Sequence, residues 1–312
     1  MKKLLLLLLF IPLVSFGQDC PPCELIANPD MEITSIKSSW PKIKNKSIVK
    51  INSLTNILYE NQDDYWEQSK RSSWWMKEGR DPWTEDPIWG DGYIEPNLNF
   101  NSCVNDNLRW KCGYSYVLRF PENFKKNKKY PLVVFLHGGI NSDPRRLNGR
   151  VLTVNNFFIP ENDQYIIASP IKLGIDWSPK KIQDVIADIE SQLKIDKKRI
   201  YLTGLSMGGR GTFIVAAELP DLFAAIMPLS PHHTPYSYLN LASKVSHLPI
   251  FLHHSTNDKT SKFSVAEKMS EELKKLNANV VFDVGEFGHS GWNKIYKNPD
   301  NINWLLSWQK SK

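Results

Sequence analysis

Ser206 lies in the run Gly204-Leu205-Ser206-Met207-Gly208, with a glycine two residues away on each side. The stretch before it, Arg199–Thr203, is β-branched and apolar like a buried strand, and Thr212–Leu219 after it has the composition of a helix that Pro220 ends. A serine on a sharp turn between a strand and a helix is the nucleophile-elbow pattern, which exposes the hydroxyl for attack on a carbonyl carbon. The alternative is a glycine-rich turn whose serine only caps the helix.

A serine hydroxyl needs a base to take its proton and an acid to orient that base. Nucleophile-elbow proteins carry the three groups in the chain order Ser, Asp or Glu, His. Asp258 follows a predicted strand at Ile250–His254, in the turn-forming stretch Ser255-Thr256-Asn257-Asp258. His289 is the only histidine after Asp258, and it lies in a loop after a predicted strand at Val280–Val284. We therefore expect Ser206 to be the nucleophile, His289 the base and Asp258 the acid that orients the imidazole.

Two other carboxyl groups near His289 are weaker candidates for the acid. Asp283 lies within a predicted strand, so its side chain points to a face of the sheet. Glu286 is close to His289 in the chain and would have to fold back on it. Asp258 therefore stays the preferred acid.

Two pairs of adjacent histidines precede the acid in the chain. His253 and His254 end a predicted strand and point to opposite faces, so we expect them to satisfy hydrogen bonds at the strand end. His232 and His233 follow another predicted strand. An ordinary surface loop is the favoured interpretation there, and lining of a pocket by one of the two is the alternative. No Cys/His or His-x-x-x-His spacing indicates zinc, so we expect neither a metal nor a cofactor.

An acyl-transfer site also needs backbone donors for the oxyanion that forms on the attacked carbonyl. One donor is expected to be the N–H of Met207, directly after the nucleophile. The other is expected from the loop after the predicted strand Leu132–Leu136, where Gly139 is the first choice and Ile140 the near alternative. The competing interpretation is that Gly138-Gly139 only forms a turn between a strand and a helix.

Several segments together resemble the secreted, single-domain branch of the α/β-hydrolases. This branch includes prolyl-oligopeptidase-like predicted peptidases, dienelactone-hydrolase-like proteins, and feruloyl or acetyl-xylan esterases. The similarity runs from about Gly113 to the C-terminus, roughly two-thirds of the chain. The matching segments are Tyr130–Gly139, Arg199–Gly209, Pro220–Ala225, Phe287–Trp292, Asn298–Asp300 and Trp304–Leu306. The resemblance implies an α/β-hydrolase fold and a serine hydrolase that needs no cofactor.

The acid loop departs from the pattern of these families. They usually carry His-Gly at its start and Val-Pro after the aspartate. Here the stretch reads His254-Ser255-Thr256-Asn257-Asp258-Lys259-Thr260-Ser261-Lys262. The acid keeps its place, but the Gly and the Val-Pro are absent.

From Tyr114 onward, predicted strands and helices alternate, which is typical of a mostly parallel, doubly wound sheet with helices on both faces. The predicted strands are Tyr114–Phe120, Leu132–Leu136, Tyr165–Ser169, Arg199–Thr203, Ala224–Leu229, Ile250–His254 and Val280–Val284. The predicted helices, besides the one after Ser206, are Lys181–Leu193, Phe263–Leu276 and Asn301–Gln309. The segment between Leu229 and Ile250 is too short for a large lid, so we expect an open site.

The N-terminal third has a different character, and we divide the chain into residues 1–17, 18–112 and 113–312. Met1-Lys2-Lys3 and the apolar run after it predict a signal peptide cleaved before Gln18, and therefore export to the periplasm or the medium. Lipidation at Cys20 is the lesser alternative, because Asp19 precedes it. No later segment is long and apolar enough for a membrane anchor.

Residues 18–112 form an irregular extension, and six of the chain's eleven tryptophans lie in its stretch from Trp40 to Trp89. We favour packing of these rings onto the hydrolase over a carbohydrate-binding platform. All four cysteines lie outside the predicted hydrolase core, and Cys103 with Cys112 is the preferred disulfide. For Cys20 and Cys23, a small local disulfide or free thiols are favoured over a redox or metal site.

The net charge is +6 and falls to +4 when Lys2 and Lys3 are removed. This positive excess is mild, and the sequence shows no basic face with interleaved aromatic residues, so we expect no nucleic-acid partner.

Taken together, these features predict a secreted serine esterase that acts on small-molecule or polysaccharide-linked esters, such as acetyl or feruloyl esters. A serine peptidase of the prolyl-oligopeptidase-like type is the first alternative. A non-catalytic carbohydrate-binding or interaction protein on a hydrolase scaffold is the second.

Overall fold

The computed structural model describes residues 48–51, 113–139, 154, 156–171, 177–234 and 237–311. These residues form an eight-stranded sheet with the strand order β1-β2-β4-β3-β5-β6-β7-β8. The strands are β1 (Ile48–Ile51), β2 (Ser115–Arg119), β3 (Tyr130–Leu136), β4 (Ile166–Ile171), β5 (Ile195–Leu205), β6 (Ala225–Leu229), β7 (Ile250–Ser255) and β8 (Val280–Gly285).

The sheet is parallel from β4 to β8 and antiparallel at its other end. Strand β2 pairs antiparallel with both β1 and β4, whereas β3, β5, β6, β7 and β8 run parallel with their neighbours. All seven residues of β3 are buried, as expected for a central strand covered on both faces. The carboxyl ends of the parallel strands therefore lie along one edge, where ligands bind in open α/β sheets.

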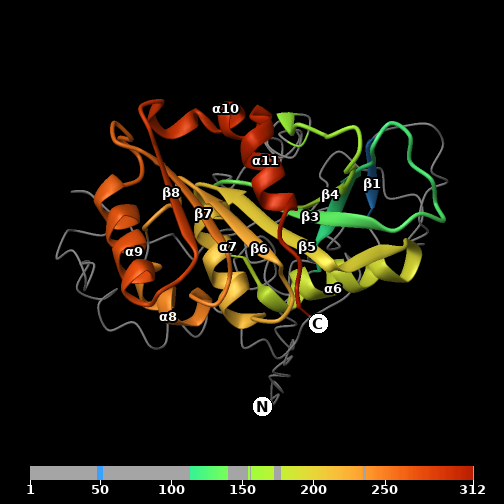
Figure 1. The fold of residues 1–312 in the computed structure, drawn as a ribbon, viewed down its shortest axis with the longest axis horizontal. Coiled ribbons are helices and arrows are strands. Elements are labelled where there is room, and N and C mark those ends of the chain that lie inside the picture. The colour runs from blue at the N-terminus through green and yellow to red at the C-terminus, as the bar shows by residue number, and fades with distance from the viewer. Residues whose placement is uncertain are drawn as a thin grey trace, which may run out of the picture.

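Helices cover both faces of the sheet (Figure 1). They are α6 (Pro179–Gln192), α7 (Met207–Glu218), α8 (Ala242–Val245), α9 (Phe263–Lys275), α10 (Trp292–Lys297) and α11 (Pro299–Leu306). One apolar cluster joins α6 to α9 with the side chains of Leu132, Val134 and Leu136, and the other joins α10 and α11 with Val133 and Phe135. Successive residues of β3 thus supply opposite layers of the core.

The alternation of strands and helices predicted from the sequence is confirmed. Each of the seven predicted strands is present, and the largest difference is that β5 begins at Ile195 rather than Arg199. Between β6 and β7 the described residues hold only α8 and a 3-10 turn, η3 (Leu239–Leu241), so no large lid lies there. Strand β1 was not predicted. It lies within the N-terminal extension and pairs with β2 in the register Ile48 with Arg119.

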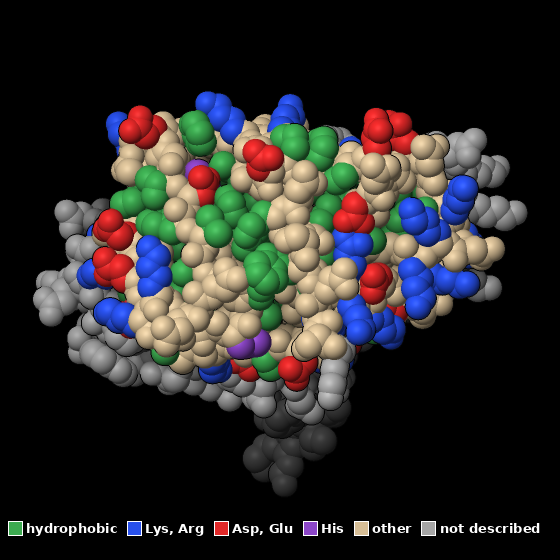
Figure 2. Space-filling model, in the orientation of Figure 1, with side chains coloured by type: hydrophobic (Ala, Val, Ile, Leu, Met, Phe, Trp, Pro, Cys, Tyr) green, Lys and Arg blue, Asp and Glu red, His purple; other side chains and the backbone are tan. Residues whose placement is uncertain are grey.

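Several sequence predictions concern residues outside the described part of the chain. These are the signal peptide, the cysteine pairings, the tryptophans between Trp40 and Trp89, and Ile140 as an alternative oxyanion donor. Within the described ranges, no helix has the length and apolar character needed to cross a membrane. On the face drawn in Figure 2, acidic and basic side chains are interspersed.

Helix α7 lies unusually close to the sheet where it begins. A Cβ atom at Gly208 would lie 2.0 Å from the carbonyl oxygen of Leu136 in β3, and one at Gly204 would lie 2.3 Å from the carbonyl oxygen of Gly208. These distances are far below van der Waals contact, so only glycine fits at either position. The close approach sets the start of α7, and with it Ser206, against the end of β3.

We expect Gly208→Ala to lower the free energy of unfolding by about 2 kcal/mol, because the added methyl group forces the start of α7 away from β3. Denaturant unfolding of the wild type and the variant measures the difference. Alanine is the better helix former by about 1 kcal/mol. An unchanged or raised stability would therefore contradict the close packing of α7 on the sheet.

Candidate active site

Ser206 occupies a strained turn between β5 and α7. Its backbone has φ 57° and ψ −118°, which a non-glycine residue rarely adopts. Three backbone hydrogen bonds hold it there. Its N–H donates to the carbonyl of Leu229 at 2.9 Å, and its carbonyl accepts from Arg210 N at 3.0 Å and from His232 N at 2.9 Å. The turn is therefore fixed by β6 and by the segment that follows β6, as well as by α7.

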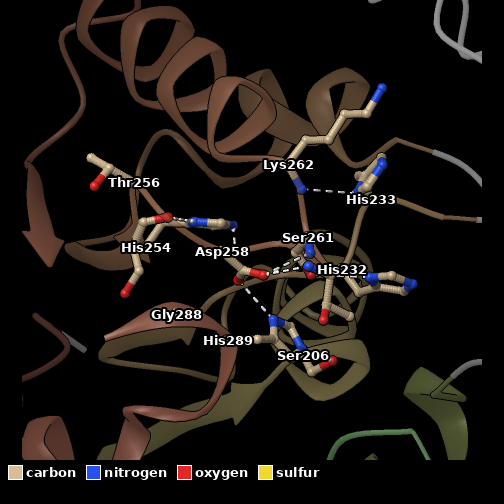
Figure 3. A network of polar contacts seen from close by, with 12 residues as sticks. Ser206, His232, His233, His254, Thr256, Asp258, Ser261, Lys262, Gly288 and His289 are labelled. Atoms are coloured by element: carbon tan, nitrogen blue, oxygen red, sulfur yellow. Dashed lines mark hydrogen bonds and ion pairs between the residues drawn. The ribbon is translucent and has the colours of Figure 1, made fainter. Parts of the chain in front are cut away.

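The structure brings Ser206, His289 and Asp258 together in one hydrogen-bonded row (Figure 3). His289 Nε2 lies 2.9 Å from Ser206 Oγ, and His289 Nδ1 lies 2.7 Å from Asp258 Oδ2. His289 is in the 3-10 turn η4 (Gly288–Ser290) after β8, and Asp258 is in the loop after β7. Neither Asp283 nor Glu286 takes the place of Asp258.

The carboxylate of Asp258 is buried, and both of its oxygens have hydrogen-bond partners. Its Oδ1 accepts from the backbone N–H groups of Thr260 at 2.8 Å and Ser261 at 2.9 Å, while Oδ2 faces His289. Burial by itself raises the pKa of Asp258, but the hydrogen bonds from His289, Ser261 and Thr260 outweigh it and hold the pKa below its ordinary value. The group is thus ionised at neutral pH and can stabilise a protonated imidazole.

Met207 and Gly139 lie beside each other next to Ser206. Met207 is the first residue of α7, so its N–H has no acceptor within the helix. A Cβ atom at Gly139 would lie 2.5 Å from Met207 Sδ, and one at Gly138 would lie 3.4 Å from Ser206 Cβ. The glycine pair after β3 thus packs closely against the turn that carries the serine.

The adjacent histidines His253 and His254 both have hydrogen-bond partners within the fold. His253 Nδ1 lies 2.6 Å from Asp283 Oδ2, and His254 Nδ1 donates to the carbonyl of Ser255 at 3.1 Å. The hydrogen bonds expected at the end of β7 are therefore present.

The expectation of an ordinary surface loop at His232 and His233 is wrong. His233 is buried and its Nδ1 accepts from the backbone N–H of Lys262 at 3.3 Å. His232 Nδ1 lies 3.0 Å from Ser261 Oγ. The segment after β6 is hydrogen-bonded to the loop that carries Asp258. These two segments are far apart in the chain, so local sequence does not reveal the contact.

Within the described residues, no group of three or more His, Cys, Asp or Glu side chains could hold a metal ion. The chemistry that the site can perform with its own groups is nucleophilic attack by an alcohol assisted by a histidine base.

His254 is fully buried, and its Nε2 lies 3.9 Å from Asp258 Oδ2. Burial lowers its pKa from the ordinary 6.5, although the hydrogen bond to Ser255 and the charge of Asp258 act in the opposite direction. The unfolded chain therefore takes up a proton at this residue at a higher pH than the folded protein does. The folded state loses stability from this residue as the pH falls below about 6.5, and loses none above it.

We expect His254→Asn to weaken the pH dependence of stability below pH 6.5. Asparagine keeps a donor for the Ser255 carbonyl but does not titrate. The slope of unfolding free energy against pH should fall by up to about 1.4 kcal/mol per pH unit. Urea unfolding at pH 7.5, 6 and 5 measures both slopes. Equal slopes in the two proteins would show that His254 does not titrate differently on folding.

Comparison with known proteins agrees with this fold. Residues 171–301 match the model of the Dienelactone hydrolase family. A bifunctional acetylxylan esterase/xylanase of Neocallimastix patriciarum is 27% identical over 192 residues, which cover 58% of this chain and 27% of the relative. A probable feruloyl esterase C of Aspergillus terreus is 27% identical over 129 residues, which cover 38% of this chain and 46% of the relative. The chain thus spans half or less of the length of these two relatives.

Among solved structures, a thermostable esterase superposes with a TM-score of 0.52 at 23% identity, over 63% of this chain and 59% of the other. This likeness concerns the fold. The order of the sheet and the shared architecture show that the chain has an α/β-hydrolase fold, and the family match falls within it at residues 171–301.

Proposed function

We propose that this protein is a serine esterase that cleaves carboxylic esters through an acyl-enzyme on Ser206. One observation carries the proposal, namely the row from Ser206 Oγ to His289 at 2.9 Å and from His289 to Asp258 at 2.7 Å. A hydroxyl, an imidazole and a buried carboxylate in this order are the parts of a catalytic triad. The names of the curated relatives, which refer to acetylxylan and feruloyl esterases, support ester cleavage over other acyl transfers.

In the first half of the reaction, Ser206 Oγ attacks the ester carbonyl carbon while His289 Nε2 takes the hydroxyl proton. The imidazole becomes positively charged, and the ionised Asp258 beside Nδ1 stabilises that charge. The tetrahedral intermediate then collapses. The bond to the alkoxy oxygen breaks, His289 donates its proton to the departing alcohol, and the acyl group stays on Ser206.

In the second half, a water molecule attacks the acyl carbonyl and His289 takes the proton from that water. Collapse of the second tetrahedral intermediate returns the proton to Ser206 and releases the carboxylic acid. The imidazole alternates between neutral and charged forms, whereas Asp258 stays ionised throughout. This division of roles follows from the carboxylate's lowered pKa.

The oxyanion of both intermediates is assigned to the N–H groups of Met207 and Gly139. Met207 is the first residue of α7, where the positive end of the helix dipole strengthens a hydrogen bond from its N–H group to an oxyanion. The contact of Gly139 with the Met207 side chain supports a second donor at the same point. Each donor of this type contributes about 3 kcal/mol to lowering the barrier.

The site suits an ester at the edge of a bulky molecule, because the described segment between β6 and β7 carries only short helical turns. Acetyl or feruloyl esters of polysaccharides are therefore the proposed substrates. Lys2 and Lys3 are followed by an apolar run, which supports export of the protein from the cytoplasm. Plant polysaccharides lie outside the cell, so export would bring the protein to such substrates.

We expect Ser206→Ala to lose ester hydrolysis by more than about 10³-fold, because no other group replaces the nucleophile. A fluorophosphonate probe should label the wild type and fail to label the variant. Thermal unfolding of both proteins serves as the folding control. Absence of labelling in the folded wild type would favour a non-catalytic binding role on the same scaffold.

We expect acetyl and feruloyl esters to be cleaved with kcat/KM at least about 10²-fold above matched peptide amides, because resonance stabilises the amide bond more strongly than the ester bond and an alkoxide is a better leaving group than an amide anion. A panel of acetyl, butyryl and feruloyl esters and peptide amides measures this ratio. Preference for amides would identify the protein as a peptidase with the same machinery.

A further inference from the structure

His232 touches both the turn that carries Ser206 and the loop that carries Asp258. It follows β6, and its backbone N–H donates to the carbonyl of Ser206 at 2.9 Å. Its own carbonyl accepts from Arg210 at 3.2 Å, and the Arg210 side chain is buried. The backbone of His232 is therefore tied to the first turn of α7 at two points.

The imidazole of His232 reaches in the other direction, toward the acid loop (Figure 3). Its Nδ1 lies 3.0 Å from Ser261 Oγ, and its Nε2 lies 2.6 Å from Thr234 Oγ1. Ser261 is buried, and its backbone N–H donates to Asp258 Oδ1 at 2.9 Å. Through one intermediate residue, the ring is thus linked to the carboxylate that faces His289.

These contacts close a circuit of hydrogen bonds. It runs from Ser206 Oγ to His289, Asp258 and Ser261, then to the ring of His232, and returns through the His232 backbone to the carbonyl of Ser206. A closed circuit restrains the acid loop relative to the nucleophile more strongly than an open chain of the same bonds does. The neighbouring bond from Lys262 N to His233 ties the same two segments a second time.

The charge state of His232 suits a fixed structural partner. Burial, followed by the positive charges of Arg210, His233 and His289, lowers its pKa to about 3, against an opposing effect of Asp258. The ring therefore stays neutral when His289 becomes positively charged, although the two ring centres are only 6.5 Å apart. No second positive charge then competes for Asp258.

We propose that His232 is a positioning residue that, through Ser261, holds the carboxylate of Asp258 in line with His289. The proposal rests on the proposed esterase function for its kinetic consequences. His232 takes no part in proton transfer, since its two ring nitrogens are bound to Ser261 and Thr234.

Two matched variants separate the bond to Ser261 from the bond to Thr234. The side-chain nitrogen of asparagine can replace imidazole Nδ1, and that of glutamine can replace Nε2. We expect His232→Gln to lower kcat about tenfold with KM changed by less than about twofold, and His232→Asn to stay within about threefold of the wild type in kcat. Ser261→Ala should resemble His232→Gln, and the double variant should lose no more than either single one.

A spectroscopic measurement tests the geometry without relying on turnover. The downfield proton NMR signal of the His289 Nδ1–H, assigned by its loss in Asp258→Asn, should persist in His232→Asn and weaken or move upfield in His232→Gln. Equal kcat in the two His232 variants, an effect on KM alone, or additive losses with Ser261→Ala would overturn the proposal. If the wild type cleaves no ester, the esterase proposal fails, and an NMR signal unaltered in His232→Gln would then reject the positioning role as well.

Discussion

The strained backbone of Ser206 is the constraint on which the rest of the site depends. A residue at φ 57° keeps that conformation only when its surroundings hold it there. Here the restraint comes from the carbonyl of Leu229 on one side and from Arg210 and His232 on the other. The absence of side chains at Gly204 and Gly208 lets α7 begin directly against the end of β3. The hydroxyl is thereby placed at the carboxyl edge of the sheet, where Asp258 and His289 also lie.

The parallel sheet explains how residues far apart in the chain meet there. Ser206 and His289 are 83 positions apart, and Asp258 and His289 are 31 apart, yet each pair is within hydrogen-bonding distance. Their segments follow β5, β7 and β8, whose carboxyl ends share one edge. Strand β7 is buried throughout and β5 is buried over its last six residues, and short loops that follow the strands carry the chemistry. This is the general arrangement of open α/β sheets.

Burial around the acid loop has a second consequence, for charge. Asp258 stays ionised because hydrogen bonds to its carboxylate outweigh the cost of burying the charge. For His232 and His254 burial is the largest effect, so it lowers their pKa values and both rings are neutral. One negative charge thus faces the imidazole of His289, and the nearby histidines add no positive charge. The same burial that organises the proposed triad makes the fold less stable in acid.

The sequence by itself determined seven of the eight described strands, the helices α6, α7, α9 and α11, and the identities of Ser206, Asp258 and His289 as candidates. Hydrophobic periodicity is local, and the chain order Ser, Asp, His leaves only one histidine after Asp258. The pairing of Ile48–Ile51 with β2 was not predictable, because four residues in an irregular segment carry too little pattern. The proposed positioning role of His232 was also hidden, because the local sequence favours a surface loop. Its bonds to Ser206 and Ser261 join segments that only the folded sheet brings together, so its partners follow from that packing rather than from its neighbours in the chain.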